Sequence, residues 1–131
     1  MSDPEEPEVQ DRRFTREEAN AMLPELREWL ARMREARQVM LRSGERVRAS
    51  VAGNGGGPEG QEYTEAVRTL RDGVERLSAE GIVLRDVEAG LVDFPAERAG
   101  RLVFLCWRLG EDDVAHWHDV DTGFPGRQRL D

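Results

Sequence analysis

The apolar residues of this sequence change their spacing once, at Gly81. Before Gly81 they recur every three or four residues, as on one face of an α-helix, and after it they alternate as in a β-strand. Helices followed by strands along one short chain predict an α+β domain. We expect an N-terminal long antiparallel helical hairpin packed on a C-terminal three- to four-stranded antiparallel sheet.

The first helix carries a clear start signal. Thr15 is a suitable N-cap residue, Glu18 completes a capping box with it, and Phe14 can pack on Ala19 as a hydrophobic staple. Pro24 lacks the N–H that would bond the carbonyl four residues earlier, so we predict a kink or a brief break there.

Both helices carry apolar seams with a period of 3.5 residues, which is typical of coiled coils. The Gly-rich segment 53–60 predicts a flexible loop between them, so the hairpin spans residues 15–80, with Gly81 as its C′ residue. The first seam is the longer, and its surplus apolar surface is expected to be covered by the sheet or by a second copy of the chain. The predicted seams are Ala19, Met22, Leu26, Trp29, Met33, Ala36, Met40 and Val47, then Tyr63, Val67, Leu70, Val74 and Leu77.

The sheet region is expected over residues 82–121. Segment 95–100 reads as a turn and segment 109–113 as a hairpin loop, and a C-terminal turn covers 122–131. Residues 1–13 predict a disordered acidic tail, which leaves a single domain over 14–131. The expected strands lie within 81–87, 90–94, 101–108 and 113–120.

Composition argues against several classes of partner. The net charge is −8 and the pI is near 4.9, so the chain repels nucleic acid and anionic membranes. No apolar run approaches the roughly 20 residues of a membrane span, and no signal-peptide pattern opens the sequence. One cysteine excludes an internal disulfide. We therefore expect a cytoplasmic protein with no nucleic-acid and no membrane partner.

Segment 106–127 holds the only cysteine and both histidines. His116 and His118 would project from one face of a strand and could share a transition metal such as zinc, nickel or iron. Cys106 on the neighbouring strand, and Asp93, are the expected further metal ligands. The alternative is an ordinary half-buried strand, with Cys106 as a small buried hydrophobic residue.

The segment DTGFPGR, residues 121–127, suggests a different ligand. Its two glycines let backbone N–H groups converge, and Arg127 adds a fork of donors beside His118. Such a pocket would hold a small anionic ligand, a carboxylate or a phosphate. The alternative is a structural turn in which Arg127 pairs with an aspartate. The other residues expected at this pocket are Trp107, Trp117, Asp119 and Asp121.

Three segments, 14–27, 90–111 and 116–128, together resemble the bacterial family known as domain of unknown function 2203. The resemblance runs from Phe14 to the C-terminus and implies no established activity. Members of that family usually have an aromatic residue at the position of His116, whereas His118 fits the motif. The resemblance therefore implies that a site common to the family depends on His118.

These observations favour a non-catalytic binding domain, for a transition metal or a small anionic ligand, centred on His118. The alternative is a homo-oligomeric structural or adaptor protein, a homodimer acting through its heptad helices. As an enzyme, the chain could use Cys106 and His118 as nucleophile and base, or His118 beside Asp119 or Asp121 as an oriented general base. No nucleophile motif supports that, so the question of an enzyme stays open with no catalytic residue assigned.

Overall fold

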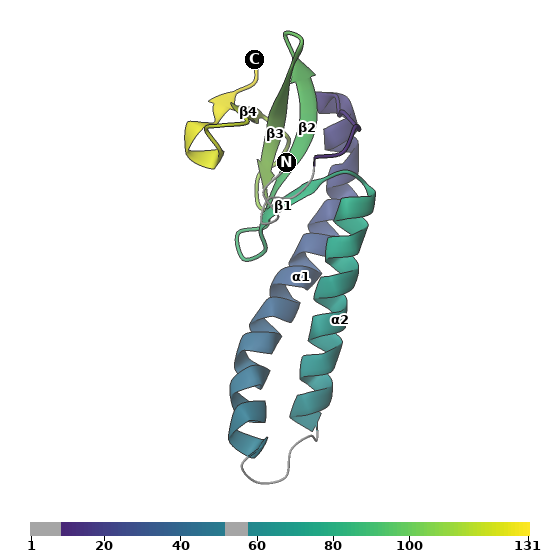
Figure 1. The fold of residues 1–131 in the computed structure, drawn as a ribbon, viewed down its shortest axis with the longest axis vertical. Coiled ribbons are helices and arrows are strands. Elements are labelled where there is room, and N and C mark those ends of the chain that lie inside the picture. The colour runs from purple at the N-terminus through teal and green to yellow at the C-terminus, as the bar shows by residue number, and fades with distance from the viewer. Residues whose placement is uncertain (1–8, 52–57) are drawn as a thin grey trace, which may run out of the picture.

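The polypeptide forms two long helices followed by a five-stranded sheet (Figure 1). The computed structural model describes residues 9–51 and 58–131, without the side chains of residues 46–51, 58 and 59. The α+β class and the helical hairpin are confirmed, but the sheet has five strands where three or four were predicted. The elements are α1 (Arg16–Val51), α2 (Pro58–Ala79), β1 (Val83–Asp86), β2 (Leu91–Arg98), β3 (Arg101–Arg108), β4 (His116–Asp119), the 3₁₀ helix η1 (Phe124–Gly126) and β5 (Gln128–Arg129).

The sheet is an antiparallel meander in which the strands pair in chain order. The extra strand, β5, lies inside the predicted C-terminal turn 122–131 and pairs with His116 and Trp117 of β4. A two-residue strand offers no alternation, so the spacing of apolar residues could not reveal it. Most of the predicted tail and of the loop 53–60 lies outside the described residues, although residues 58–60 belong to α2.

Strand β2 continues through much of the segment 95–100 that was predicted as a turn. The carbonyl of Pro95 accepts the N–H of Phe14 at 2.7 Å, from outside the sheet. The N–H and C=O of one residue point to the same side of a strand, so the missing N–H of Pro95 also faces outward. β1 pairs only with the first three residues of β2, so the proline costs no hydrogen bond in the ladder. The turn itself is Ala99 and Gly100, both with positive φ.

The ends of the helices follow the predicted capping chemistry. The Thr15 hydroxyl accepts the N–H of Glu18 at 3.0 Å, and the Glu18 carboxylate accepts the N–H of Thr15 at 2.9 Å. After α2, Gly81 has a φ of 79°, and the N–H of Ile82 bonds the carbonyl of Leu77 at 3.0 Å. This is a Schellman motif, so the capping box and the C′ glycine are both confirmed.

Helix α1 continues through Pro24 without the brief break that was considered. A proline inside a helix removes one hydrogen bond, and the buried neighbours Leu23 and Leu26 hold the helix on both sides of it. Tertiary packing therefore outweighs the local preference.

The seam of α2 differs from the predicted one at two positions. Ala66 is buried while Val67 is 38% exposed, and Gly73 faces α1 while Val74 is 46% exposed. Small residues at the contact let the two helices approach closely, because a Cβ on Gly73 would lie only 2.5 Å from the sulfur of Met33. The positions of the larger apolar residues therefore did not predict which face of α2 contacts α1.

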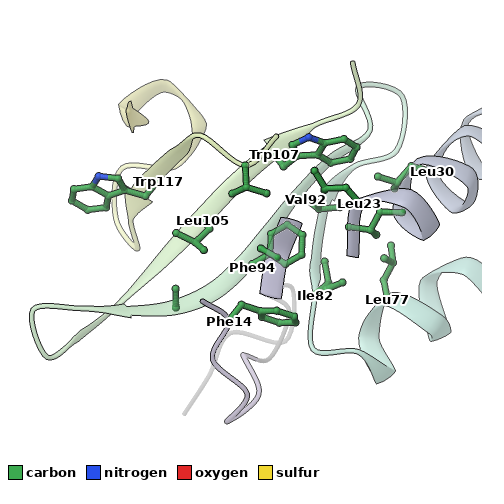
Figure 2. Packing of buried hydrophobic residues seen from close by; sticks show 14 of the residues in the cluster. Phe14, Leu23, Leu30, Leu77, Ile82, Val92, Phe94, Leu105, Trp107 and Trp117 are labelled. Atoms are coloured by element: carbon green, nitrogen blue, oxygen red, sulfur yellow. The ribbon is translucent and has the colours of Figure 1, made fainter. Parts of the chain in front are cut away.

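The core lies where the sheet meets the half of the hairpin near Gly81, and the other half projects away from the sheet (Figure 1). α1 buries Leu23 and Leu30 in one cluster with Phe94 and Trp107 of the sheet (Figure 2). The sheet thus covers the surplus apolar surface of the first helix. Within the described residues, neither helix is long and apolar enough to cross a membrane.

Alternation along the strands gives the sheet two chemically different faces. The face toward the hairpin, here called the helix face, is apolar, and the opposite one, here called the outer face, carries the side chains with reactive chemistry. The buried residues of the helix face are Val92, Phe94, Ala96, Val103, Leu105, Trp107 and Trp117. Those of the outer face include Asp93, Phe104, Cys106 and His118.

Because Gly73 contacts Met33 closely, the stability of the protein should depend on the size of the side chain at position 73. We expect Gly73→Leu to lower the free energy of unfolding by about 1–3 kcal/mol, the usual cost of overpacking, measured by urea denaturation. Gly60→Leu on the same helix is the control, because a Cβ at Gly60 meets nothing within 4 Å. Equal stabilities of the two variants would contradict the close helix contact.

Candidate metal-binding site

Three neighbouring strands bring Asp93, Cys106 and His118 together on the outer face. Asp93 of β2 lies directly across from Cys106 of β3, and His118 of β4 lies one diagonal step away, across from Phe104. One ligand atom from each of the three residues lies within 4.8 Å of the others. Their exposures are 1%, 1% and 2%, so the cluster is shielded from water.

Both ring nitrogens of His118 face acceptors. Nδ1 lies 2.7 Å from the carbonyl of Asp119, and Nε2 lies 2.9 Å from Oδ2 of Asp93. Neither a carbonyl nor an ionised carboxylate donates a hydrogen, so this geometry favours a ring that donates at both positions, the protonated imidazolium form. Arg85 donates to the same Oδ2 at 2.8 Å. Oδ1 of Asp93 is buried and has no hydrogen-bond partner.

The surroundings of Asp93 raise the pKa of both His118 and Cys106, for different reasons. Burial lowers the pKa of His118, but the hydrogen bonds to Asp93 and Asp119 and the charge of Asp93 outweigh burial and raise it overall. Burial, and then the charge of Asp93, raise the pKa of Cys106 to about 12. Without a metal the thiol is therefore protonated at neutral pH, which disfavours a nucleophilic role.

His116, which was expected among the metal ligands, belongs to a different group. Its Nδ1 lies 2.5 Å from Nη2 of Arg127, which also donates to Glu111 at 2.7 Å, and this leaves Nε of Arg127 buried without a partner. Burial and the charge of Arg127 lower the pKa of His116. A neutral His116 accepting from Arg127 fits this geometry.

The structure does not assemble the anion pocket that was expected around His118 and Arg127. Trp107 and Trp117 point to the helix face, because residues an odd number of positions from Cys106 and His118 lie on the other side of a strand. The anticipated apolar wall is therefore absent from the outer face.

Neither aspartate expected at that pocket pairs with Arg127. Asp119 pairs with Arg101 at 2.9 Å, and Asp121 is exposed. Arg127 pairs instead with Glu111 of the preceding loop. The structural turn that was the alternative reading is thus present, with a different acidic partner.

Arg85 is the residue of this site that the sequence interpretation missed. Its guanidinium bonds Asp93 and lies 5.0 Å from the centre of the Phe104 ring. The strand pattern VLRD contained a usable signal, because it places Arg85 two residues after Val83, and Val83 lies directly across from Asp93. The irregular register of β1 at this point made the match uncertain from spacing alone.

A family model described as "Uncharacterized conserved protein (DUF2203)" matches residues 12–130. The chain belongs to the DUF2203 family. No curated protein and no solved structure gives a significant match. Because the family description records no activity, the function of this DUF2203 chain has to be argued from its own geometry.

The opposite shifts of the two histidines predict opposite effects of pH on stability. The folded-state pKa of His118 is raised, so its stabilisation is complete below the ordinary value near 6.5 and is lost as pH rises through the folded-state pKa. We expect wild type to exceed His118→Gln in free energy of unfolding by more at pH 5.5 than at pH 8.5. Urea denaturation of metal-free protein measures this difference.

His116→Gln on the same strand is the matched control. The folded-state pKa of His116 is lowered, so the unfolded chain takes up that proton first, and wild type loses stability relative to this variant as pH falls below about 6.5. The same pH trend in both variants would contradict the protonation states assigned here.

Proposed function

We propose that the chain is a metal-binding domain in which Asp93, Cys106 and His118 hold a transition metal ion. A carboxylate, a thiolate and an imidazole form a mixed oxygen, sulfur and nitrogen donor set, which suits zinc, nickel or iron(II) better than calcium or magnesium. The observation that carries the proposal is the convergence of these three buried side chains within 4.8 Å from three separate strands.

Two further features support this donor set. Oδ1 of Asp93 is buried without a partner, which costs free energy, and a bound cation would provide the missing interaction. His118 is oriented through Nδ1 by the Asp119 carbonyl, leaving Nε2 directed at Asp93. Histidine ligands are commonly oriented in this way by a backbone carbonyl.

Metal loading would release protons. Cys106 must lose its thiol proton and His118 its Nε2 proton before either can act as a ligand. The affinity of the site for metal should therefore rise steeply with pH. Arg85 disfavours metal binding, because its guanidinium places a positive charge beside Asp93 and donates a hydrogen bond to Oδ2.

The proposal predicts near-stoichiometric binding of zinc or cobalt(II) at pH 8, with a thiolate-to-cobalt charge-transfer absorption. Cys106→Ser should abolish that absorption, and His118→Gln should weaken binding by more than about 100-fold, beyond the usual cost of an outer-shell change. Arg85→Gln should strengthen binding several-fold, because it removes a nearby cation. Calorimetric titration and absorption spectroscopy of tag-free protein measure these effects.

His116→Gln is the control for this experiment, because His116 lies on the same strand outside the donor set. It should bind metal as wild type does. Wild type that takes up no zinc, cobalt or nickel at micromolar concentrations would refute the proposal, and equal losses in His116→Gln and His118→Gln would refute the assignment of ligands.

A second candidate function is self-association through the hairpin. Val67 and Val74 lie seven residues apart on α2 and are 38% and 46% exposed, so α1 leaves a heptad-spaced apolar stripe uncovered. Light scattering should then show a dimer that the double variant Val67→Asp, Val74→Asp converts to a monomer. A wild type that is monomeric at all concentrations would remove this candidate.

A further inference from the structure

The helical hairpin carries most of the large apolar side chains that are exposed within the described residues. Leu41 of α1 is 56% exposed, and Val67 and Val74 of α2 are 38% and 46% exposed. The others in the described part of the chain are Val9 and Val120, which lie outside the hairpin. Exposed apolar residues that gather on one element commonly mark an interaction surface.

Leu41 lies on the side of α1 that faces the sheet. Earlier in the same helix, Arg34 donates to the carbonyl of Glu88 at 2.7 Å, and Arg37 donates to the Glu88 carboxylate at 2.9 Å. Glu88 belongs to the turn between β1 and β2. Leu41 follows the two arginines by seven and four residues, and residues at these spacings share one side of a helix.

The two valines lie on the matching side of α2. Val74 lines a cavity together with Leu84 of β1, so this side of α2 also faces the sheet. Val67 precedes Val74 by seven residues, which places it on the same side and nearer the tip of the hairpin. Leu41, Val67 and Val74, here called the hairpin stripe, therefore lie on the side of the hairpin that carries the sheet.

We propose that a second copy of the chain covers the hairpin stripe, with the two hairpins antiparallel and face to face. The inference rests on the self-association proposed above and adds its geometry. The sheet stands on the same side as the stripe, so two parallel hairpins that met there would bring their sheets into the same space. Antiparallel hairpins place the sheets at opposite ends.

The projecting half of the hairpin is long enough for this contact (Figure 1). α1 continues from Gln38, which also bonds Glu88, to Val51, and this leaves each copy about 20 Å of helix beyond its own sheet. Two such halves can lie side by side along their stripes.

Charges along α1 favour the antiparallel arrangement. Arg37, Leu41 and Glu45 follow one another at intervals of four residues, so all three lie on the stripe side of the helix. A two-fold axis at Leu41 sets Leu41 against its own copy and each Arg37 against Glu45 of the partner subunit. The Arg37 side chain is 43% exposed and bonds Glu88 through one of its five donors, and Glu45 is exposed. The stripe is thus complementary in charge to itself.

The same axis brings apolar residues of α2 together. A Cβ on Gly44 would lie 3.5 Å from the ring of Tyr63, so these two residues are level on the two helices. Because the helices run antiparallel, three residues back along α1 match three residues forward along α2, and Leu41 is therefore level with Ala66. Tyr63 and Val67 flank that level, so Val67 of one copy meets Tyr63 of the partner subunit.

Cross-linking tests the position of the axis. Leu41→Cys in the full-length protein places two thiols together, so mild oxidation should convert most of it to a covalent dimer at concentrations where wild type self-associates. Val120→Cys is the control, because Val120 is 52% exposed but follows β4, outside the hairpin, and it should stay monomeric on a denaturing gel. The native Cys106 is buried and does not compete.

Charge exchange tests the ion pair. Arg37→Glu and Glu45→Arg should each raise the dimer dissociation constant at least about threefold, because each change sets like charges opposite each other at two places in a symmetric dimer. The double variant restores opposite charges and should dimerise within about twofold of wild type. Loss of the bond between Arg37 and Glu88 gives no such recovery, since Glu45→Arg does not replace it. Sedimentation equilibrium measures these constants.

The outcomes separate the geometry from self-association itself. A wild type that stays monomeric at all concentrations would overturn both and leave the stripe to a different partner. The antiparallel arrangement alone is wrong if Val67→Asp with Val74→Asp dissociates a wild-type dimer while Leu41→Cys does not cross-link, or while the double charge variant does not recover.

Discussion

The alternation of side chains along β3 is the constraint on which the rest of the structure depends. β3 pairs with β2 over its whole length and with β4 over half of it, so its register decides what every neighbouring residue meets. Val103, Leu105 and Trp107 belong to the apolar core on one face of the sheet, while Cys106 faces the other way. A shift of one residue would move the reactive side chains into the core and the tryptophan onto the outer face.

That constraint explains what could and could not be predicted from the sequence. The two periods of apolar residues predicted the class, the hairpin and β3 itself, and local capping chemistry predicted the helix ends at Thr15 and Gly81. Contacts that depend on tertiary structure were not predicted. Gly73 lies at the contact between the helices where Val74 was expected. Pro95 lies inside β2 because β1 does not extend far enough to pair with that part of the strand.

The candidate site was predicted in part, and for the same reason. The register between β3 and β4, which the sequence did not determine, places Cys106 and His118 on one face, and the meander brings Asp93 beside them. Alternation also separates Trp107 from His118, which a reading of the segment as one continuous pocket overlooked. The ion pair between Arg85 and Asp93 depends on an irregular register at β1, which residue spacing does not encode.

Burying the charged groups of the outer face costs free energy unless these groups pair with one another. A carboxylate as deeply buried as Asp93 loses its hydration, and removing one partner of such a pair is far more damaging than replacing the whole group by apolar residues. Here Arg85 and His118 both bond to Oδ2, while Oδ1 is left without a partner. Two cations thus share one carboxylate oxygen, so the metal-free cluster carries excess positive charge with a vacant acceptor beside it. A divalent ion that displaced the protons of His118 and Cys106 would reverse that balance, and its affinity for the cluster would rise with pH because those protons must leave.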